Sequence, residues 1–490
     1  MVAQLWRNPP LAGRWSAAVA MALLGLGPFV VLSTASFPLS PVLRPELGGS
    51  RAGLQLANGL ANAAYALSVV VAADLVQRLP ARRIYLACTA CFAAGSGLAA
   101  LAPSAAWFTA GRVLQGAATG MLLVVALPPL VTRHGAARIP LTVALINLGL
   151  FGGAAAGTTI GGLLAGPGQW RLLLAALAAV GLVAFGVGAL AFEPGEAPSP
   201  HMGFDFSGIP LAAAATVLPF LGVSLLAGGG GPVAVTATLI ATGLAALVAL
   251  VVREYRKERA LMPVRLIAHT LPVTGIGSAM LAGAGFTAVV ELCVLRLRDV
   301  DGLSPPALGG VLATQLAGMA LALWLITRVL STRWLPVLVL GGLFTISAAG
   351  ALLAGAGALP AVPAVAVTGL LLGLGAGAGV GPGLFLGALS VPAPRLGPAF
   401  ALVQLLRAEA AFLFAPVLLR TATAAPDTAA GIREAAVLIA ATTAAGAVVL
   451  TGVLLLGGSR PQAPDLPRWV DGDGPAYHSP PMAALLRRRS

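Results

Sequence analysis

The sequence predicts an all-α membrane protein with about fourteen transmembrane helices, and two observations support this prediction. Of the 490 residues, 58% are hydrophobic and only 9% are charged, and the mean hydropathy is +0.94. An ordinary soluble domain carries about 25% charged residues, so this chain lacks the polar side chains that would cover a globule in water. The second observation is a series of apolar runs, each about as long as the roughly 20 residues that a helix needs to cross a bilayer.

The apolar runs form groups of six, two and six along the chain. We expect spans at residues 15–37, 53–74, 84–103, 106–130, 141–165, 170–192, 208–227, 232–252, 271–296, 306–329, 334–356, 361–388, 396–420 and 433–457. The first run is longer than the core of a cleavable signal peptide, and no small-residue cleavage site follows it. We therefore expect it to be the first span.

This grouping predicts five segments. They are a cytoplasmic N-terminus (1–14), an N-terminal set of six helices (15–192), a linker with two extra helices (193–270), a C-terminal set of six helices (271–457) and a tail (458–490). The tail is rich in proline and charge, so we expect it to be disordered and cytoplasmic. Its terminal arginines favour contact with anionic membrane lipid.

The distribution of basic residues predicts that both termini are cytoplasmic. With the N-terminus inside, 20 of the 29 Lys and Arg residues lie in cytoplasmic segments, 7 lie in outer segments, and Arg112 and Arg407 lie within spans. This split follows the positive-inside rule, and the acidic stretch from Glu193 to Asp205 is its exception. The net charge of +13 is thus a topology signal on short loops, so we expect no nucleic acid partner. The bias toward Ala, Gly, Pro and Arg suggests a GC-rich bacterial genome, so the membrane that we expect is a bacterial cell membrane.

No enzyme site, metal or cofactor is expected. Cys88 and Cys91 form a CxxC pattern inside an apolar run, where redox or metal chemistry would lack accessible thiolates and further ligands. We interpret these cysteines as packing residues. The four histidines, His134, His201, His269 and His478, are scattered along the chain, and no cluster of ligating residues surrounds them.

The most specific motif lies in the fourth predicted span, where Gly111-Arg112-Val113-Leu114-Gln115-Gly116 places an arginine about a third of the way into a membrane helix. An intramembrane arginine is costly unless it faces a protein interior or water, and is a functional residue by default. The R-x-x-Q-G pattern resembles the fourth-helix motif of major facilitator superfamily transporters. That resemblance implies two six-helix bundles around a central site.

Small residues in the fifth span also resemble this superfamily. Gly157 and Gly161 lie four residues apart, a spacing that lets helix backbones approach closely. The pattern is similar to the fifth-helix motif of the superfamily's antiporters, although Thr158 occupies a position where proline is usual. The Trp170-Arg171 pair that opens the sixth span fits the same family. Packing in any membrane bundle is the alternative interpretation of these glycines.

The segment between the second and third spans resembles the superfamily's gating signature in part. Asp74 occupies the acidic position, and Arg78, Arg82 and Arg83 follow it, but Val70 and Gln77 replace the expected glycines. The resemblance implies that Asp74 and these arginines form a charge-paired gate, together with the flexible glycines Gly157 and Gly161. An aspartate that merely ends a helix is the alternative.

Four landmarks are similar to the fourteen-span drug:proton antiporter branch, which has two extra helices between its bundles. They are Phe204–Gly208 before the seventh span, Arg253–Leu266 after the eighth, Gly302–Pro305 before the tenth, and Arg407 after Gln404 in the thirteenth. The twelfth span carries Gly369, Gly373, Gly377 and Gly381 at four-residue spacing, plus Gly375, Gly379 and Gly383. No G-x-G-x-x-G pattern fits them, so we interpret this span as a close-packing, flexible gating helix.

Proton-driven transport needs an acid that can bind a proton within the membrane. Asp74, Glu291 and Glu409 are the acids in or beside spans, and Glu409 lies nearest the middle of its span. A glutamate near Arg112 or Arg407 could be tuned for reversible protonation, so we predict Glu409 and Glu291 as proton-coupling residues. The branch usually carries an aspartate in the first helix, but Pro28–Pro38 (PFVVLSTASFP) contains no acid. A weakly coupled exporter or facilitator is therefore an open alternative, as is a structural role for each glutamate.

Polar residues within spans are candidates for the substrate cavity. Asn58, Asn62 and Tyr65 follow one helical face, and polar faces of membrane helices usually turn toward the bundle interior. The other candidates are Gln115, Asn147, Gln315 and Gln404. Hydrogen bonding between helices is the alternative role. With so few buried charges, we expect a largely apolar cavity that suits a lipophilic or weakly cationic substrate.

Together these features predict a secondary active transporter, most simply a monomer, that exports amphipathic or hydrophobic small molecules in exchange for protons. Drugs, antibiotics or a self-made metabolite are the candidate substrates. An uncoupled carrier for a lipid or metabolite, and a transport-dead scaffold or sensor, remain as alternatives.

Overall fold

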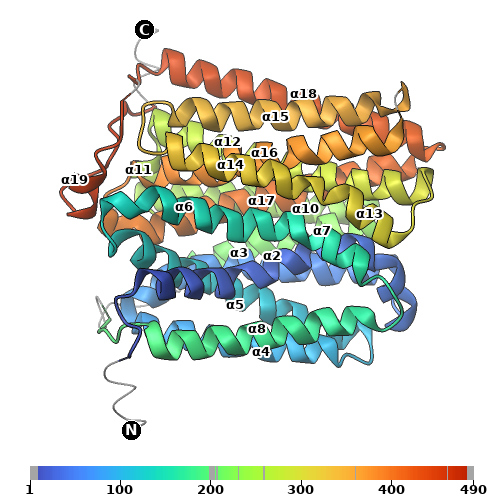
Figure 1. The fold of residues 1–490 in the computed structure, drawn as a ribbon, viewed down its shortest axis with the longest axis horizontal. Helices are drawn as coiled ribbons and strands as arrows, with labels where there is room; N and C mark the ends of the chain where they lie inside the picture. The colour runs from blue at the N-terminus through green and yellow to red at the C-terminus, as the bar shows by residue number, and fades with distance from the viewer. Residues whose placement is uncertain are drawn as a thin grey trace. The chain divides into compact units, whose positions relative to one another are not determined.

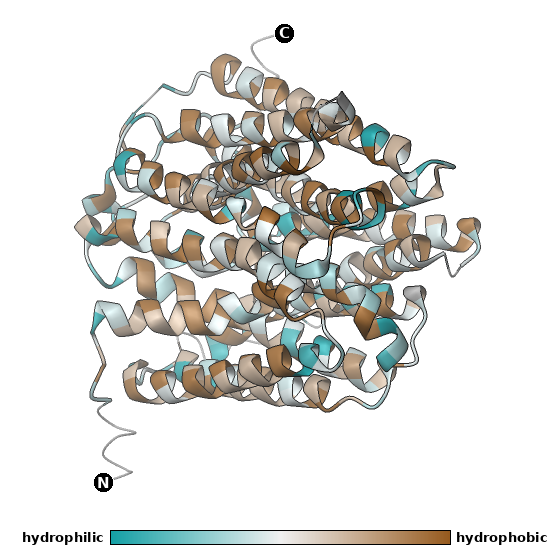
Figure 2. Ribbon diagram, turned by 45° about the vertical axis from the view of Figure 1, so that its right-hand side comes forward, coloured by the Kyte–Doolittle hydropathy of each residue, from teal (hydrophilic) through white to brown (hydrophobic). Residues whose placement is uncertain are grey.

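The computed structural model describes residues 9–197, 205, 208–229, 231–257, 260–358, 360–460 and 462–482. It is 83% helical and contains no strand in this part of the chain. Among the described residues, fourteen helices are long and apolar enough to cross a membrane, so the predicted number of spans is confirmed. Figure 2 shows that hydrophobic residues dominate these helices.

The helices form two compact units, and the chain passes between them more than once. Unit 1 comprises Met1–His134 and Leu164–Met262, and unit 2 comprises Gly135–Leu163 and Pro263–Ser490. Unit 1 contains α2 (Trp15–Glu46), α3 (Arg51–Arg78), α4 (Ala81–Ala100), α5 (Ala105–Thr132), α8 (Gln169–Ala191), α9 (Gly208–Gly228) and α10 (Val233–Arg256). All of these helices except α9 are labelled in Figure 1.

Unit 2 contains the remaining spans and three short helices outside them. Its spans are η1–α6–η2–α7 (Ala136–Leu163), α12 with η3 (Thr270–Val300), α13–α14 (Pro305–Val329), α15 (Leu335–Gly355), α16 (Ala361–Ala388), η5–α17 (Ala393–Ala424) and α18 (Thr428–Leu456). The short helices are α11 (Val264–Ile267), η4 (Ala356–Ala358) and α19 (Leu466–Val470).

The fifth span belongs to unit 2 by its contacts, although the sequence places it among the first six helices. α7 packs on α13, and α6 packs on α14 and α16. Thr159 donates a hydrogen bond to the carbonyl of Gly309 at 3.0 Å, and a Cβ on Gly162 would lie 2.5 Å from the carbonyl oxygen of Pro305. Small residues thus let α7 and α13 touch backbone to backbone.

The ends of most predicted spans agree with the helices to within a few residues, and the first span differs most. Its helix continues past residue 37 to Glu46, with Pro38, Pro41 and Pro45 inside it. Proline is tolerated in membrane helices because neighbouring groups compensate for the missing hydrogen bonds. The sequence pattern ended this span at the first of these prolines.

Two spans contain a π-helical segment. In the fifth span η2 (Leu148–Gly152) separates α6 (Ile139–Asn147) from α7 (Gly153–Leu163), and in the ninth η3 (Arg296–Val300) ends the helix. Single π turns inside α-helices occur frequently at functional sites. In the fifth span the π-helical turn directly follows Asn147 and ends at Gly152. The helical hydrogen-bond pattern therefore changes about one turn before Gly157, in a segment that contains no proline.

Glycines allow α16 to pack closely on two sides. A Cβ on Gly373 would lie 1.9 Å from the backbone oxygen of Gln315 in α14, and one on Gly383 would lie 2.6 Å from that of Gly275 in α12. Neither clash could be relieved by a side-chain movement. The close-packing interpretation of this glycine-rich helix therefore agrees with the contacts, and its role in gating stays a prediction.

The tail after α18 differs from the expectation of disorder over residues 462–482. Trp469 of α19 is fully buried, and its Nε1 donates a hydrogen bond to the carbonyl of Val391 at 2.8 Å. The backbone N–H of Ala476 donates to Leu389 at 2.8 Å. Tyr477 is also buried, which raises the pKa of its hydroxyl. Two aromatic anchors therefore hold a segment whose average composition favours disorder; residues 461 and 483–490 lie outside the described part.

Candidate functional site

The motif arginine of the fourth span lies at one end of a buried chain of hydrogen bonds in unit 1. Arg112 of α5 is 1% exposed. Its Nη1 donates a hydrogen bond to Oε1 of Gln115 at 2.9 Å, and Nε2 of Gln115 donates to Oγ of Ser96 in α4 at 2.8 Å. The chain of bonds orients the guanidinium, since Gln115 is itself held at both ends of its amide.

An aromatic pair covers the same guanidinium. The Arg112 guanidinium carbon lies 5.4 Å from the ring centroid of Phe29 in α2, within the range of a cation–π interaction. Phe29 stacks on Tyr65 of α3, with centroids 5.6 Å apart and planes 5° apart. The structure thus brings together Arg112, Gln115 and Tyr65, all three of which the sequence predicted.

Phe29 and Ser96 are members of this site that the sequence did not indicate. Phe29 lies in the first-helix segment that drew attention only because it contains no acid. Ser96 is one of many small residues in an apolar helix, and no sequence signal distinguishes it. We define the Arg112 site as Phe29, Tyr65, Ser96, Arg112 and Gln115. Asn62 lies three residues before Tyr65 on α3.

The glycines of the motif explain how the arginine comes to be so deeply buried. A Cβ on Gly111 would lie 2.5 Å from the carbonyl oxygen of Gly95 in α4, and one on Gly116 would lie 2.0 Å from that of Ala61 in α3. Both neighbouring helices therefore approach the α5 backbone directly. Arg112 and Gln115, which lie between these two glycines, are enclosed as a consequence.

The polar stripe on α3 is half enclosed. Asn62 is 8% exposed, and its Oδ1 is buried without a hydrogen-bond partner among the described residues. Asn58, one turn earlier, is only partly buried. A buried acceptor without a partner is unusual in a folded protein, so Asn62 has unused capacity to bind a donor.

Glu409 is the most isolated acid in the described part of the chain. It lies near the middle of α17 (Leu396–Ala424) and is 3% exposed. Both of its carboxyl oxygens are buried and have no hydrogen-bond partner among the described residues. Nearby on the helix, Nε of Arg407 donates to Oε1 of Gln404 at 2.7 Å. Arg407 and Glu409 therefore do not form an ion pair in this conformation.

Glu291 occupies a different environment from Glu409. It is partly exposed in α12 (Thr270–Leu295) and interacts electrostatically with Arg298 of η3, close to the end of the ninth span. Arg298 also pairs with Asp299, and Arg296 pairs with Asp301. Glu291 thus belongs to a group of charges at a span end, which favours the structural alternative for this residue.

Two predicted cavity amides in unit 2 lie beside α16. Nδ2 of Asn147 donates a hydrogen bond to the carbonyl of Gly377 at 3.1 Å, while its Oδ1 has no partner in the described chain. Gln315 of α14 is fully buried, and neither of its amide atoms has a partner there. Asn147 thus links helices, whereas Gln315 keeps its whole hydrogen-bonding capacity.

The predicted gate residues separate into three environments. Asp74 is 1% exposed at the end of α3, and Nη2 of Arg78 donates to its Oδ1 at 2.9 Å. Nη2 of Arg82 donates to the carbonyl of Ala189 in α8 at 2.7 Å. Arg83 is exposed. Asp74 and Arg78 are therefore paired within one helix, and Arg82 ties α4 to α8.

Gly157 and Gly161 of α7, the other two predicted gate residues, are both buried. They lie in the helix whose neighbouring Thr159 and Gly162 contact α13.

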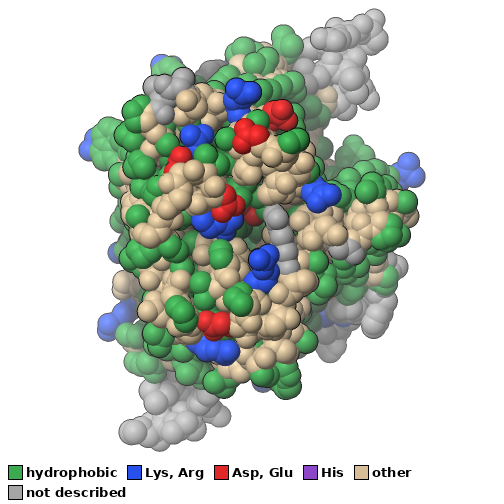
Figure 3. All heavy atoms as spheres, turned by 90° about the vertical axis from the view of Figure 1, so that its right-hand side faces the viewer, with side chains coloured by type: hydrophobic (Ala, Val, Ile, Leu, Met, Phe, Trp, Pro, Cys, Tyr) green, Lys and Arg blue, Asp and Glu red, His purple; other side chains and the backbone are tan. Residues whose placement is uncertain are grey.

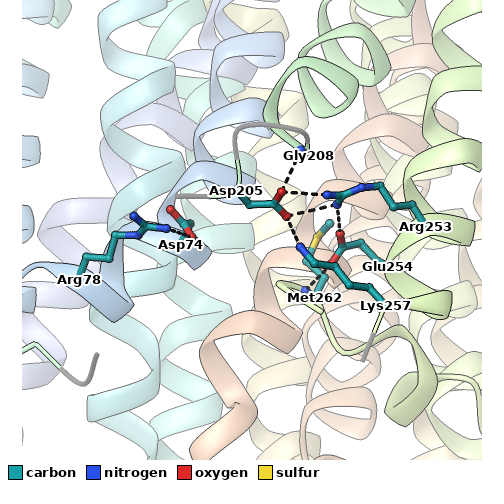
Figure 4. Close-up of polar contacts among 8 residues, drawn as sticks. All are labelled: Asp74, Arg78, Asp205, Gly208, Arg253, Glu254, Lys257 and Met262. Carbon is teal, nitrogen blue, oxygen red and sulfur yellow. Dashed lines mark hydrogen bonds and ion pairs between the residues drawn. The ribbon is translucent and has the colours of Figure 1, made fainter. Parts of the chain in front are cut away.

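The junctions around the two extra helices form an ionic cluster, shown with the Asp74–Arg78 pair in Figure 4. Asp205 accepts hydrogen bonds from Arg253 at 2.8 and 3.2 Å and from Lys257 at 2.7 Å. Glu254 accepts from Arg253 at 2.7 Å and from the backbone N–H of Met262 at 3.2 Å. These bonds connect the start of α9 to the end of α10. Residues 204, 206, 207, 258 and 259 of the junction motifs lie outside the described residues.

This cluster also explains the acidic exception to the charge distribution. Asp205 neutralises Arg253 and Lys257, and Glu193 pairs with Arg133 at 2.8 Å. The acidic stretch therefore balances basic residues that lie near it in space. Charged side chains of both signs are also visible on the face of the molecule in Figure 3.

Two bacterial transport proteins are similar to this chain in sequence. A cephamycin export protein of Amycolatopsis lactamdurans is 31% identical over 305 residues, which are 59% of this chain and 61% of that protein. An uncharacterized MFS-type transporter of Bacillus subtilis (strain 168) is 28% identical over 309 residues, which are 62% of this chain and 60% of that protein. The matched region thus spans about three fifths of the length of these relatives.

The fold is similar to that of solved transporters. The crystal structure of a peptide transporter in complex with sulfate matches this chain with a TM-score of 0.63 and 16% sequence identity. The match covers 93% of this chain and 98% of that chain. This likeness concerns the fold alone. The sequence matches the Major Facilitator Superfamily over residues 22–416, and the chain therefore belongs to that superfamily.

Proposed function

We propose that the chain is a secondary active transporter that exports amphipathic or hydrophobic small molecules in exchange for protons. The observation that carries this proposal is Glu409, a carboxyl group enclosed near the middle of α17 with neither oxygen hydrogen-bonded in the described chain. Membership of a transporter superfamily supplies the class of function, and Glu409 supplies the proposed coupling.

A buried carboxylate without a partner is costly, because both its hydration and its compensating charge are missing. A proton removes that cost. When the surrounding helices move apart and water reaches Glu409, the ionised form becomes acceptable and the proton can leave. Proton occupancy at this residue is thereby linked to the conformation, as coupled transport requires.

Alternating access supplies the movement in this proposal, with the substrate site near the midplane of the membrane. Arg407 and Gln404 lie on the same helix as Glu409 and would respond to its charge. The Asp74–Arg78 pair, with Arg82, Arg83, Gly157 and Gly161, would control opening. Asn58, Asn62, Tyr65, Gln115, Asn147 and Gln315 would supply the polar contacts of the cavity.

The setting of this activity is also part of the proposal. We place the protein in a bacterial cell membrane as a monomer, with both termini in the cytoplasm, because the basic residues concentrate in the segments on that side. Membrane lipid surrounds it, protons and a small-molecule substrate are its partners, and nucleic acid is not. The cephamycin export protein among its relatives favours antibiotics or self-made metabolites as the substrate class.

An uncoupled carrier is the second candidate, and one observation favours it. The first-helix segment Pro28–Pro38 contains no acid, and the residue that covers Arg112 there is the phenylalanine Phe29. If Glu409 were only a structural group, the protein could move its substrate down a gradient without protons.

Transport by the purified full-length protein in liposomes separates these candidates. A resistance screen of cells that express the gene identifies a compound, and its movement is then followed with and without an imposed pH gradient. We expect the rate to rise with the gradient and to fall when a protonophore collapses it. Equal rates in both conditions would favour the uncoupled carrier, and no movement of any compound would favour the scaffold.

A further inference from the structure

We propose that the Arg112 site binds an anionic group of the substrate, so that the preferred cargo is an aromatic organic anion. This inference rests on the proposed export function and names its substrate class. It changes the expectation from composition, which favoured a lipophilic or weakly cationic compound. The observation behind it is a buried cation whose counter-charge is missing.

The partners of Arg112 are all neutral. Its guanidinium donates to the amide oxygen of Gln115 and lies over the ring of Phe29. Arginine stays charged in proteins, and at 1% exposure this charge receives little help from water. An amide oxygen and an aromatic ring reduce the cost of burial without balancing the charge.

The described acids of unit 1 are all engaged or exposed elsewhere. Glu46 binds Trp170, Asp74 binds Arg78, Glu193 binds Arg133, Asp205 and Glu254 bind Arg253, and Glu196 is exposed. No ion pair joins any of these six residues to Arg112. Within the part of unit 1 that the structure describes, the cation is therefore left without an acidic partner.

An aromatic pair, Phe29 of the first helix and Tyr65 of α3, lies beside the guanidinium. Phe29 and Tyr65 stack almost in parallel, with planes 5° apart. Asn62 lies one turn before Tyr65 on α3, is 92% buried, and has an amide oxygen without a partner in the described chain. A stacked ring pair and a cation thus meet at one site, and an acceptor without a partner lies one turn away on α3.

These groups select for charge. A carboxylate, sulfonate or phenolate would balance Arg112 and gain charge-assisted hydrogen bonds from its planar donors. A cation would meet a like charge at a site with little water, where repulsion is strong. The aromatic pair would receive the ring system of the ligand, and Asn62 would accept from a hydroxyl or N–H group on it.

The site is closed in this conformation, because Arg112, Phe29 and Tyr65 are all at most 5% exposed. Entry of the anion therefore requires the opening that alternating access provides. An arginine already paired with an acid would not need an anionic ligand. We therefore expect anion binding to depend on Arg112 and to alter how easily the protein opens.

The test uses two fluorescent probes that share a xanthene ring system and differ in charge. Fluorescein is an anion at pH 8, and rhodamine 6G is a cation. Binding to the purified full-length protein is measured in detergent, without a gradient, for the native chain, Arg112→Gln, Arg112→Lys and the exposed-site control Arg44→Gln. We expect tighter binding of fluorescein than of rhodamine 6G, and about a tenfold loss of fluorescein affinity in Arg112→Gln, as expected for losing one charge-assisted pair. Arg112→Lys should keep part of the preference, and Arg44→Gln should keep all of it.

A second variant keeps the test decisive if Arg112→Gln does not fold. Phe29→Glu places an acid beside Arg112 and supplies the missing counter-charge from within the protein. We expect this variant to lose fluorescein binding and to gain rhodamine 6G binding. Unchanged binding of both probes in either folded variant, or tighter binding of rhodamine 6G by the native chain, would overturn the inference.

Inorganic anions provide a further arm. The measurements are repeated with chloride replaced by gluconate. Suppose that chloride, compared with gluconate, stabilises the native protein but not Arg112→Gln, and that fluorescein does not bind. The site then takes an inorganic ion, and the inference is wrong. If fluorescein binds through Arg112 but no pH-driven movement occurs in liposomes, export fails and the binding inference stands. If export proceeds equally for both probes and without Arg112, only the inference fails.

Discussion

The indole Nε1 of Trp469 donates a hydrogen bond to the backbone carbonyl of Val391 at 2.8 Å, and the side chain around it is fully buried. Trp469 belongs to the short helix α19 of the tail, and Val391 belongs to the loop after α16. A tail segment is therefore anchored to the loop that follows the glycine-rich helix of unit 2.

Replacing this anchor should release the tail. We expect Trp469→Ala to lower the melting temperature of the purified protein, because removing a buried tryptophan typically costs roughly 3–5 kcal/mol of unfolding free energy. Trypsin should also cut faster after Arg468, which is exposed. Trp334→Ala is the matched control, since Trp334 is 54% exposed. Equal effects of the two substitutions would show that the tail does not depend on Trp469.

The glycine at the α5–α3 contact should not accept a methyl group. A Cβ on Gly116 would lie 2.0 Å from the backbone oxygen of Ala61, whereas one on Gly97 would meet nothing within 4 Å. We expect Gly116→Ala to destabilise the protein by about 1–3 kcal/mol, the range for overpacking, and Gly97→Ala to have little effect. Thermal unfolding in detergent measures both, and a stable Gly116→Ala protein would contradict the close approach.

Removing the ionisable carboxyl group of Glu409 should uncouple substrate transport from the proton gradient. In Glu409→Gln the side chain keeps its size but cannot release a proton, so we expect the stimulation by a pH gradient to disappear in liposomes. Movement of substrate down its own gradient should persist. Glu434→Gln is the control, because Glu434 is exposed on α18. Full stimulation in Glu409→Gln would exclude this residue as the coupling acid.

The ionic cluster between α9 and α10 should stabilise the two extra helices modestly. Arg253 and Lys257 are 25% and 36% exposed at their side chains, so water screens their attraction to Asp205. We expect Asp205→Asn to cost about 1 kcal/mol and to increase trypsin cleavage at Lys257. Glu196→Gln, in the exposed part of the same linker, should leave cleavage unchanged. An increase in cleavage that is the same for both variants would contradict the role of Asp205.

Much of the fold could be predicted because hydropathy acts locally. Each span is a continuous apolar stretch, and its length is set by the bilayer. The prediction was least accurate where local signals and tertiary context disagree. The first helix continues through Pro38, Pro41 and Pro45 to Glu46, and the tail is held by aromatic residues that its average composition conceals.

The candidate site could be predicted only in part, for a related reason. An arginine inside a span is conspicuous, and Gln115 and Tyr65 were found from motif and spacing. Phe29 was not, because an aromatic residue in an apolar helix carries no signal until its neighbour is known. The same applies to the pairing of Asp205 with Arg253, which are 48 residues apart in the chain.

The sequence by itself determined that this protein is a fourteen-helix membrane protein of a transporter family, and where its unusual polar residues lie. Only the tertiary structure decided which of those residues are compensated. Asp74 has its arginine, whereas Arg112 has no acid and Glu409 has no donor in the described chain. The physical reason is that the cost of a buried charge depends on the groups within a few ångströms of it, and helix packing alone brings those groups together.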